Sequence, residues 1–501
     1  MPEKIESNAN PYLALGVRPF INCCSVRTMH GGSLMLPQVR AAMDQASRQF
    51  VNLDELMEAA GRRLAELTGA EWGIVTCGSA AAVALASAAC IAGNDPVRML
   101  RLPFTDGWVN RVILPRNQRF AYDQAIRMVG AHIVEIDSIA DLDAALAEPV
   151  AMVAILGTNE ENSRVRLEEI VARVKPLGIP ILVDAASEHL ERPSPWLVRG
   201  ADMVIYSGGK FLRGPQTSGL LLGNKNLVQA AWRNASPHQA FGRPMKVSKE
   251  DVIGVLTAVE YWLEERDEIA ELQRWHDDLQ EIARRVAEVP GVSSVVIAPA
   301  GVVRVPALRV RWDGIALDGM GLRARLLDGT PRIMIDDTAA TANSVVIDPF
   351  QFQPGEAAEV GKAVAAMLAT ARSVEPAREP PPLIDLSGEW SLHVRFLHGQ
   401  RSHRLRLQQQ GSRLTGSQES EQFAGKVVGR LTARDILMEF EARHEGSAIA
   451  YRFEGTADSD RMTGEVLLGS ATDSHRGPVN LSQFGRGQWQ AQRSAQQEIG
   501  K

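Results

Sequence analysis

Between residues 72 and 223 the chain alternates short apolar runs with segments of helical character. The apolar runs are WGIVT, RVILP, AHIVEID, VAMVAILG, IPILVDAA, MVIYS and GLLLG. Helical patterns fill several of the gaps, among them the Ala-rich stretch at 79–92 and LEEIVARVK at 167–175. Continuous apolar strands separated by helices are typical of a mainly parallel sheet that is covered on both faces. We therefore expect an α/β domain here.

A proline-rich stretch at 373–382, SVEPAREPPP, divides the chain, because clustered prolines oppose both helices and central strands. After it, runs such as HRLRLQQQ and AIAYRFEG alternate apolar with polar residues, which indicates antiparallel strands in a small β-barrel or sandwich. Before it, a helical pattern at 252–286 precedes the strand-like runs VSSVVIAP, ALRVRWD and SVVIDPF and a closing helix over 354–371. The predicted parts are an N-terminal segment (1–16), a large domain (17–251), a smaller α+β domain (252–372), the linker (373–382), a β-barrel-like domain (383–492) and a tail (493–501).

Charge and cysteine usage narrow the class of protein. Lys and Arg total 54 against 60 Asp and Glu, and this net charge of −6 does not indicate a nucleic-acid or anionic-membrane partner. The four cysteines show neither a CxxC pair nor zinc-ligand spacing, which argues against a disulfide scaffold or metal site and fits a reducing compartment. No apolar run reaches the length of a membrane span. We expect a cytoplasmic protein.

The segment Gly78, Ser79 and Ala80 stands where the strand WGIVT passes into the Ala-rich helix. Small residues at such a point let a phosphate approach the backbone N–H groups at the positive end of the helix dipole. An ordinary strand-to-helix turn with a serine cap has the same pattern. This segment alone does not decide between the two.

Two further segments carry residues suited to one cofactor. Asp184 ends the apolar strand IPILVD, at the edge where ligands of open α/β sheets bind, and a buried carboxylate there needs a cationic partner such as a protonated pyridine nitrogen. Lys210 follows the strand MVIYS in a glycine-rich turn suited to a Schiff-base lysine, where Ser207 can add a hydroxyl to a phosphate. Taken singly, Asp184 could be a helix cap or a salt-bridge partner, and Lys210 a solvated surface lysine. Their offset of 26 residues, each after its own strand, together with the helix start at Gly78, favours a pyridoxal-phosphate pocket.

The block SGGKFLRGPQTSGLLLG is the most specific motif in the chain, and NLD with GRR, LTGAE, GSAAA and VDAAS accompany it. With these motifs, the run from about residue 17 to 371 resembles the fold-type I pyridoxal-phosphate enzymes of the selenocysteine-synthase-like family. The resemblance implies a large mainly parallel-sheet domain with a smaller α+β domain, in a homodimer or higher homo-oligomer. It implies that Lys210 is the Schiff-base lysine and that Asp184 partners the pyridine nitrogen. The residues it implies for the phosphate are Gly78, Ser79, Ala80 and Ser207.

Three arginines are candidates for substrate binding, because a guanidinium binds a carboxylate or phosphate through two hydrogen bonds. Arg116 follows the strand RVILP, where the family carries an arginine near the cofactor. Arg332 lies in the smaller domain, where fold-type I enzymes often place a carboxylate-binding arginine. Arg27 lies on an N-terminal segment that can reach active sites in this fold. The alternative for Arg116 and Arg332 is that each is a solvent-exposed arginine with no role in substrate binding.

The resemblance implies a lyase that eliminates the β-hydroxyl of a β-hydroxy amino acid or amino-sugar acid and releases ammonia with a 2-keto acid. A second hypothesis is an aldolase, racemase or transferase that acts on an amino acid. A third is a non-catalytic scaffold that retains the fold. The chain departs from selenium transferases because its enzyme core begins near Pro11, without a tRNA-binding extension, and because it carries a C-terminal β-domain. We therefore expect a small-molecule substrate and no nucleic-acid partner.

Overall fold

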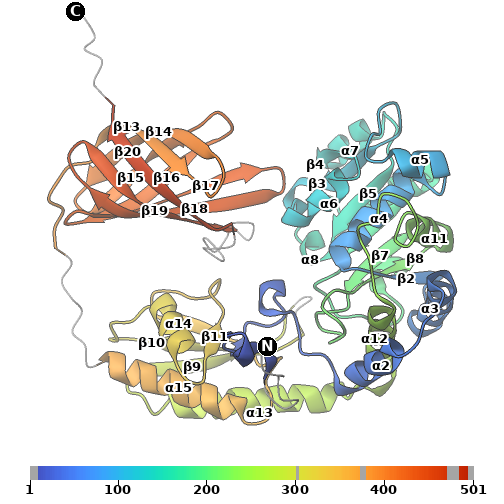
Figure 1. Cartoon of the computed structure of the whole chain (residues 1–501), viewed down its shortest axis with the longest axis horizontal. Helices are drawn as coiled ribbons and strands as arrows, with labels where there is room; N and C mark the ends of the chain where they lie inside the picture. The colour runs from blue at the N-terminus through green and yellow to red at the C-terminus, as the bar shows by residue number, and fades with distance from the viewer. Residues whose placement is uncertain (1–9, 301–303, 373–379, 471–483, 495–501) are drawn as a thin grey trace, which may run out of the picture. The chain divides into compact units, whose positions relative to one another are not determined.

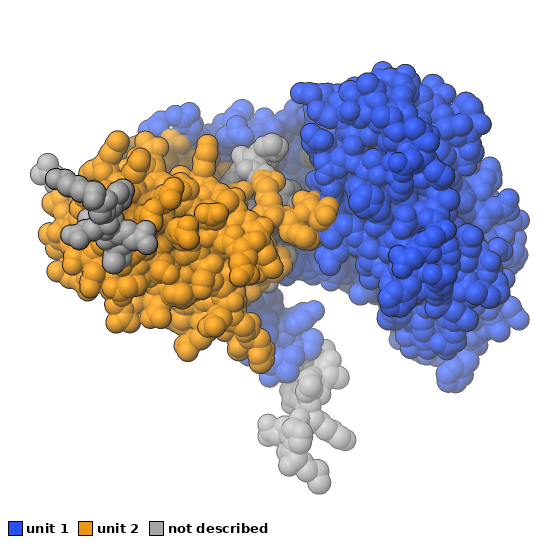
Figure 2. Space-filling view, turned by 90° about the horizontal axis from the view of Figure 1, so that it is seen from above, with its two compact units in different colours: residues 1–313, 321–336, 344–369 blue, residues 314–320, 337–343, 370–501 orange. Residues whose placement is uncertain are grey.

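The computed structural model describes residues 10–300, 304–372, 380–470 and 484–494 (Figure 1). The chain forms two compact units, coloured blue and orange in Figure 2. The first comprises residues 1–313, 321–336 and 344–369, and the second comprises residues 314–320, 337–343 and 370–501. The predicted N-terminal segment up to residue 9, the linker at 373–379 and the tail from residue 495 lie outside the described residues. The six-part division therefore stays a prediction.

A seven-stranded sheet forms the centre of the first unit. Its strands, in order across the sheet, are β2 (Trp72–Thr76), β8 (Gly219–Gly223), β7 (Met203–Ser207), β6 (Ile181–Asp184), β5 (Met152–Leu156), β3 (Arg111–Pro115) and β4 (His132–Ile136). Strand β8 runs antiparallel to both of its neighbours, and the strands from β7 to β4 are parallel. Every residue of β2, β6 and β8 is buried, which is why these strands read as continuous apolar runs. The predicted mainly parallel sheet is confirmed.

Helices connect and cover these strands. The helices of this part are α2 (Pro37–Ser47), α3 (Leu53–Thr68), α4 (Ser79–Ala92), α5 (Pro96–Arg101), α6 (Gln124–Arg127), α7 (Ile139–Ala145), α8 (Gly157–Glu160), α9 (Leu167–Val174), α10 (Pro195–Val198), α11 (Lys225–Arg233) and α12 (Lys249–Glu260). Helix α4 packs against β7 and β8 and is buried along nearly its whole length. Its alanines make this possible, because small side chains let a helix lie close against several neighbours.

The smaller α+β part contains the three strands that the sequence predicts. Strand β10 (Ala307–Trp312) pairs antiparallel with β9 (Val292–Ile297) and β12 (Ser344–Ile347), and β1 (Ile21–Cys23) pairs parallel with β11 (Ile333–Ile335). Helices α13 (Glu268–Val286), α14 (Gly319–Asp328) and α15 (Glu356–Arg372) complete it.

The helical pattern at 252–286 forms two successive helices, α12 and α13. After α12 a π-helical turn follows at Tyr261–Glu265, and Arg266 is extended. The side chain of Asp267 then accepts a hydrogen bond of 2.9 Å from the backbone N–H of Ala270 and caps α13. This cap starts the second helix after the π-helical turn.

The second unit contains a closed barrel of eight antiparallel strands. They are β13 (Gly388–Arg395), β14 (Gln400–Gln410), β15 (Arg413–Glu419), β16 (Ala424–Thr432), β17 (Asp435–His444), β18 (Ser447–Ala457), β19 (Arg461–Ser470) and β20 (Arg486–Arg493). Along β14 buried and exposed residues alternate, as expected for strands with one face on the core. The barrel has its own apolar core, with Trp390 and Phe453 fully buried. Among the described residues, no helix combines the length and apolarity that crossing a bilayer requires.

Candidate active site

Asp184 and Lys210 come from neighbouring parallel strands, β6 and β7. Asp184 is the last residue of β6 and pairs in register with Ile205, shortly before β7 ends at Ser207. A turn then carries Lys210 close enough to Asp184 for the charge of each to act on the other. The carboxyl ends of adjacent parallel strands lie at one edge of a sheet, which is where ligands of such sheets bind. The structure therefore brings these two predicted residues together.

Asp184 is only 9% exposed, and its Oδ1 accepts a hydrogen bond of 3.0 Å from the backbone N–H of Ala186. Burial raises the pKa of Asp184, while this hydrogen bond and the charge of Lys210 act in the opposite direction. Because burying an ionised carboxyl is costly, a cation placed against it stabilises the charged form. A protonated pyridine nitrogen meets that requirement.

The turn that carries Lys210 depends on its glycines. A Cβ atom added to Gly209 would lie 2.3 Å from the Cα atom of Gln216, so only glycine fits at this position. The backbone N–H of Gly214 donates to the carbonyl of Gly208 over 2.8 Å and closes the turn. Burial lowers the pKa of Lys210, and the charge of Asp184 partly offsets this effect. A lysine with a lowered pKa is more often neutral, which is the state in which an amine acts as a nucleophile.

The start of α4 is built to receive an anion. Gly78 precedes the helix with φ 98° and ψ 159°, and within the described part of the chain no side chain caps the first backbone N–H groups of this helix of 14 residues. A Cβ atom on Gly219 would lie 2.5 Å from the carbonyl carbon of Gly78 and 2.6 Å from the backbone nitrogen of Ser79, so glycine allows this close approach. Ala80 is exposed, and Ser207 is half-buried at the end of β7. An uncapped helix start, a buried carboxyl and a half-buried lysine together fit the phosphate, ring nitrogen and carbonyl of pyridoxal phosphate.

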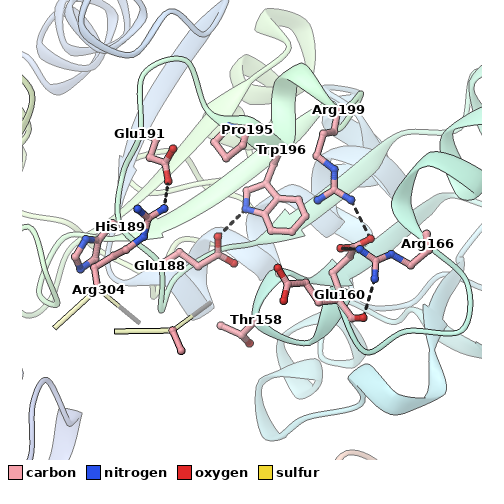
Figure 3. Close-up of a pocket in the computed structure, with 13 residues that line it drawn as sticks. Thr158, Glu160, Arg166, Glu188, His189, Glu191, Pro195, Trp196, Arg199 and Arg304 are labelled. Carbon is pink, nitrogen blue, oxygen red and sulfur yellow. Dashed lines mark hydrogen bonds and ion pairs between the residues drawn. The ribbon is translucent and has the colours of Figure 1, made fainter. Parts of the chain in front are cut away.

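A cavity of about 510 Å³ lies beside the loop that leaves β6 (Figure 3). Its lining includes Glu188 and Trp196, whose indole nitrogen donates a hydrogen bond of 2.8 Å to Glu188 Oε2. Burial raises the pKa of Glu188 to about 7. Figure 3 also shows Glu160 between Arg166 and Arg199, with a hydrogen bond of 3.0 Å to each. The cavity thus combines paired charges with one carboxyl group that titrates near neutrality.

Sequence reasoning missed Ser187 and Glu188, which follow Asp184 in VDAASEH. The Nζ atom of Lys210 donates a hydrogen bond of 2.8 Å to Ser187 Oγ, and Glu188 lines the cavity. Polar residues directly after the Asp184 strand were the available signal, because a loop at this edge faces the same site.

Two of the predicted arginines, Arg116 and Arg332, have partners on other parts of the chain. Arg116 follows β3, is 64% exposed and pairs with Glu135 over 3.1 Å; β5 separates its strand from β6. Arg332 donates to the backbone carbonyls of Leu327 and Arg18 over 3.1 and 3.2 Å. Their roles in substrate binding stay predictions.

The N-terminal segment around Arg27 lies against the turn that follows Lys210. Arg27 forms an ion pair with Asp336 of the smaller part. The next residue, Thr28, accepts a hydrogen bond of 2.7 Å through its backbone carbonyl from Gln216 Nε2. The segment therefore contacts the glycine-rich turn of its own chain, and a substrate contact by Arg27 stays a prediction.

Comparison with known proteins extends these observations, although no family model matches the chain. The 5'-C-glycyluridine monooxygenase-decarboxylase of a Streptomyces species is 31% identical over 366 residues, covering 70% of this chain and 89% of that protein. The D-glucosaminate-6-phosphate ammonia lyase of Salmonella typhimurium (strain 14028s) is 29% identical over 362 residues, covering 70% of this chain and 95% of that protein. A solved structure of D-glucosaminate-6-phosphate ammonia-lyase superimposes with a TM-score of 0.65 at 28% identity, covering 73% of this chain and 99% of that one. The chain belongs to the selenocysteine-synthase-like family of fold-type I pyridoxal-phosphate enzymes.

Proposed function

We propose that this protein is an ammonia-lyase that eliminates the β-hydroxyl of a β-hydroxy amino acid or an amino-sugar acid. The observation that carries the proposal is the juxtaposition of Lys210, Asp184 and Ser187 at one edge of the sheet, beside a polar cavity. The relatives support the substrate class, since one is named as a lyase of an aminated sugar acid phosphate. In the net reaction, the Cα proton and the β-hydroxyl group leave as one molecule of water. Hydrolysis of the resulting enamine consumes one molecule of water, so the products are a 2-keto acid and ammonia.

When bound, pyridoxal phosphate supplies a carbonyl that takes up the substrate amine and a ring that accepts the electrons left at Cα. The backbone N–H groups of Ser79 and Ala80, with the hydroxyl of Ser207, would hold the phosphate at the start of α4. Asp184 would place a negative charge against the ring nitrogen. These groups would fix the position of the reacting carbon atom relative to Lys210.

Lys210 acts as the base that removes the Cα proton, because burial lowers the pKa of its amine. Ser187 accepts a hydrogen bond from this amine over 2.8 Å and orients its lone pair. Glu188, the next residue, lines the neighbouring cavity and accepts a hydrogen bond of 2.8 Å from the indole of Trp196.

The test is to load the purified protein with pyridoxal phosphate and incubate it with β-hydroxy amino acids, D-glucosaminate and D-glucosaminate 6-phosphate. We expect ammonia and a 2-keto acid in equal amounts from at least one of them, and neither from a Lys210→Ala variant. Release of carbon dioxide with consumption of oxygen would instead favour a reaction like that named for the Streptomyces relative. An exchanged Cα proton without ammonia would favour a racemase, and a released aldehyde an aldolase.

We also propose that the protein acts as a cytoplasmic homodimer on a small molecule, without a nucleic-acid partner. All four cysteines are free thiols, which suits a reducing compartment, and the net charge of −6 does not suit an RNA surface. Light scattering at several protein concentrations measures the oligomeric state, and a monomer with full activity would contradict the dimer.

A further inference from the structure

Residues 27–36 form a strap that lies along the glycine-rich turn after β7. Near one end of the strap, the backbone carbonyl of Thr28 accepts a hydrogen bond of 2.7 Å from Gln216 Nε2. At the other end, the backbone N–H of Leu36 donates to the carbonyl of Arg213 over 3.1 Å. The strap is therefore fastened to this turn at both ends.

Between these two points, Ser33 holds the carbonyl oxygen of Gly209. The hydroxyl of Ser33 donates a hydrogen bond of 3.0 Å to this oxygen, and the backbone N–H of Ser33 donates one of 3.2 Å. Ser33 is only 8% exposed, and Gly209 is buried. A carbonyl oxygen has two lone pairs and can accept both bonds. The carbonyl directly before Lys210 is thus bound twice by one residue of the strap.

A glycine at residue 32 lets the strap come this close to the turn. Gly32 has φ 71°, in the left-handed region that glycine adopts at little cost. A Cβ atom at residue 32 would lie 2.7 Å from the carbonyl oxygen of Gly209 and 3.1 Å from Gln216 Cγ. The first distance is too short for a carbon–oxygen contact, so a larger residue would push the strap away from the turn. Backbone conformation and spacing therefore both require glycine beside Ser33.

The position of this carbonyl oxygen bears directly on Lys210. The carbonyl group of Gly209 and the nitrogen and Cα atoms of Lys210 belong to one planar peptide unit. Hydrogen bonds that fix the oxygen therefore also restrict where the Cα atom of Lys210 can lie. At the far end of the side chain, Lys210 Nζ donates a hydrogen bond of 2.8 Å to Ser187 Oγ. Ser33 thus holds Lys210 at its backbone, and Ser187 holds it at its amine.

Other contacts keep the strap in place without the hydroxyl of Ser33. The backbone N–H of Leu34 donates a hydrogen bond of 3.0 Å to Oε1 of Gln351, a residue that is only 4% exposed. The carbonyl of Leu34 accepts one of 3.1 Å from Arg213 Nε. Because these bonds do not involve the side chain of Ser33, removing its hydroxyl should loosen the Gly209 peptide without detaching the strap.

We propose that Ser33 is a positioning residue for Lys210, which keeps the amine where it can reach the carbonyl of pyridoxal phosphate. Ser33 acts through the peptide of Gly209 and takes no part in the chemistry. The inference rests on the proposed role of Lys210 in attaching the cofactor. Without the hydroxyl, the Gly209 carbonyl keeps one of its two hydrogen bonds from Ser33. The amine should then reach the cofactor less often, and attachment should be slower.

The rate at which the full chain, freed of cofactor, attaches added pyridoxal phosphate tests the proposal, and absorbance follows it. We expect attachment in Ser33→Ala to be about fivefold slower than in the unaltered chain, as the loss of one ordinary hydrogen bond predicts. The matched control is Ser87→Ala, because Ser87 is fully buried and its hydroxyl donates 2.8 Å to the carbonyl of Val83 within α4. This control should attach the cofactor at the original rate. An unchanged rate in Ser33→Ala, or equal slowing in both variants, would overturn the proposal.

A second measurement needs no cofactor and so separates this inference from the proposed function. Hydrogen–deuterium exchange of residues 208–214 in the full chain should be faster in Ser33→Ala than in the unaltered chain or in Ser87→Ala. An unaltered chain that attaches no cofactor would refute the proposed function, whereas unchanged exchange in Ser33→Ala would refute the role of Ser33. If Ser33→Ala fails to fold, Ser33→Cys, whose thiol is a weaker donor, takes its place with the same expected results.

Discussion

The amine of Lys210 donates a hydrogen bond of 2.8 Å to the hydroxyl oxygen of Ser187. Ser187 lies on the loop that begins at Asp184, whose charge raises the pKa of the same amine against the effect of burial. One short loop therefore carries both the group that orients Lys210 and the carboxyl that influences its protonation. This relationship leads to the first three predictions.

Replacing Lys210 with alanine should abolish covalent attachment of the cofactor and reduce turnover by about 10³-fold or more, because the nucleophile and the base are lost together. Borohydride reduction followed by mass spectrometry detects the attachment, and the matched control is Lys246→Ala at an exposed lysine. A borohydride-reducible adduct that persists in Lys210→Ala would show that another amine holds the cofactor.

Replacing Asp184 with asparagine should leave the cofactor bound but lower kcat by about 10²-fold, because an amide does not stabilise a protonated ring nitrogen. Absorbance of the purified variant measures cofactor content, and ammonia release measures turnover. If Asp184→Asn kept full activity, the carboxyl would have only a structural role.

Replacing Ser187 with alanine should lower kcat by about tenfold and leave KM and thermal stability nearly unchanged, since Ser187 is exposed and positions Lys210 rather than supporting the core. Ser187→Thr keeps the hydroxyl group and should restore most of the activity. An equal loss in both variants would argue that the hydrogen bond to Lys210 is not what matters.

Glu188 should make the protein less stable as the pH rises. Its pKa in the folded protein is about 7, above the ordinary glutamate value of 4.5, so between these values the folded state binds more protons than the unfolded state. Stability from this group is fully present below pH 4.5 and is lost as the pH rises towards 7, by at most about 1.4 kcal/mol per pH unit.

A Glu188→Gln variant should not suffer this loss, because glutamine does not ionise and can still accept the hydrogen bond from Trp196. Thermal melts of both proteins from pH 5 to 8 should show the variant gaining stability relative to the original chain as the pH rises. A constant difference in melting temperature would mean that Glu188 has an ordinary pKa.

Removing residues 383–501 should leave a cofactor-binding homodimer. The apolar core around the seven-stranded sheet is built from residues between 36 and 259, and the barrel has a separate core. Light scattering and cofactor absorbance of the truncated protein check this prediction. Aggregation or loss of cofactor would mean that the barrel covers an apolar surface that the remaining chain cannot expose.

The strands and the closeness of Asp184 to Lys210 could be predicted from the sequence, because their signals are local. Strands buried on both faces, such as β6, read as continuous apolar runs, and barrel strands with one buried face, such as β14, read as alternating ones. Asp184 and Lys210 each follow an apolar strand, and the ends of parallel strands meet at one edge. Residues close in sequence carried all of this information.

Only the tertiary structure decided which side chains become partners. Arg116 pairs with Glu135 because β3 lies beside β4 and apart from β6, and chain order does not reveal this strand order. Arg332 donates to the carbonyl of Arg18, far away in the chain. His403 and Gln418 are two polar residues in alternating strands until the register of β14 and β15 turns both inward and joins them. Propensity and periodicity act within one segment, whereas partners depend on how distant segments pack.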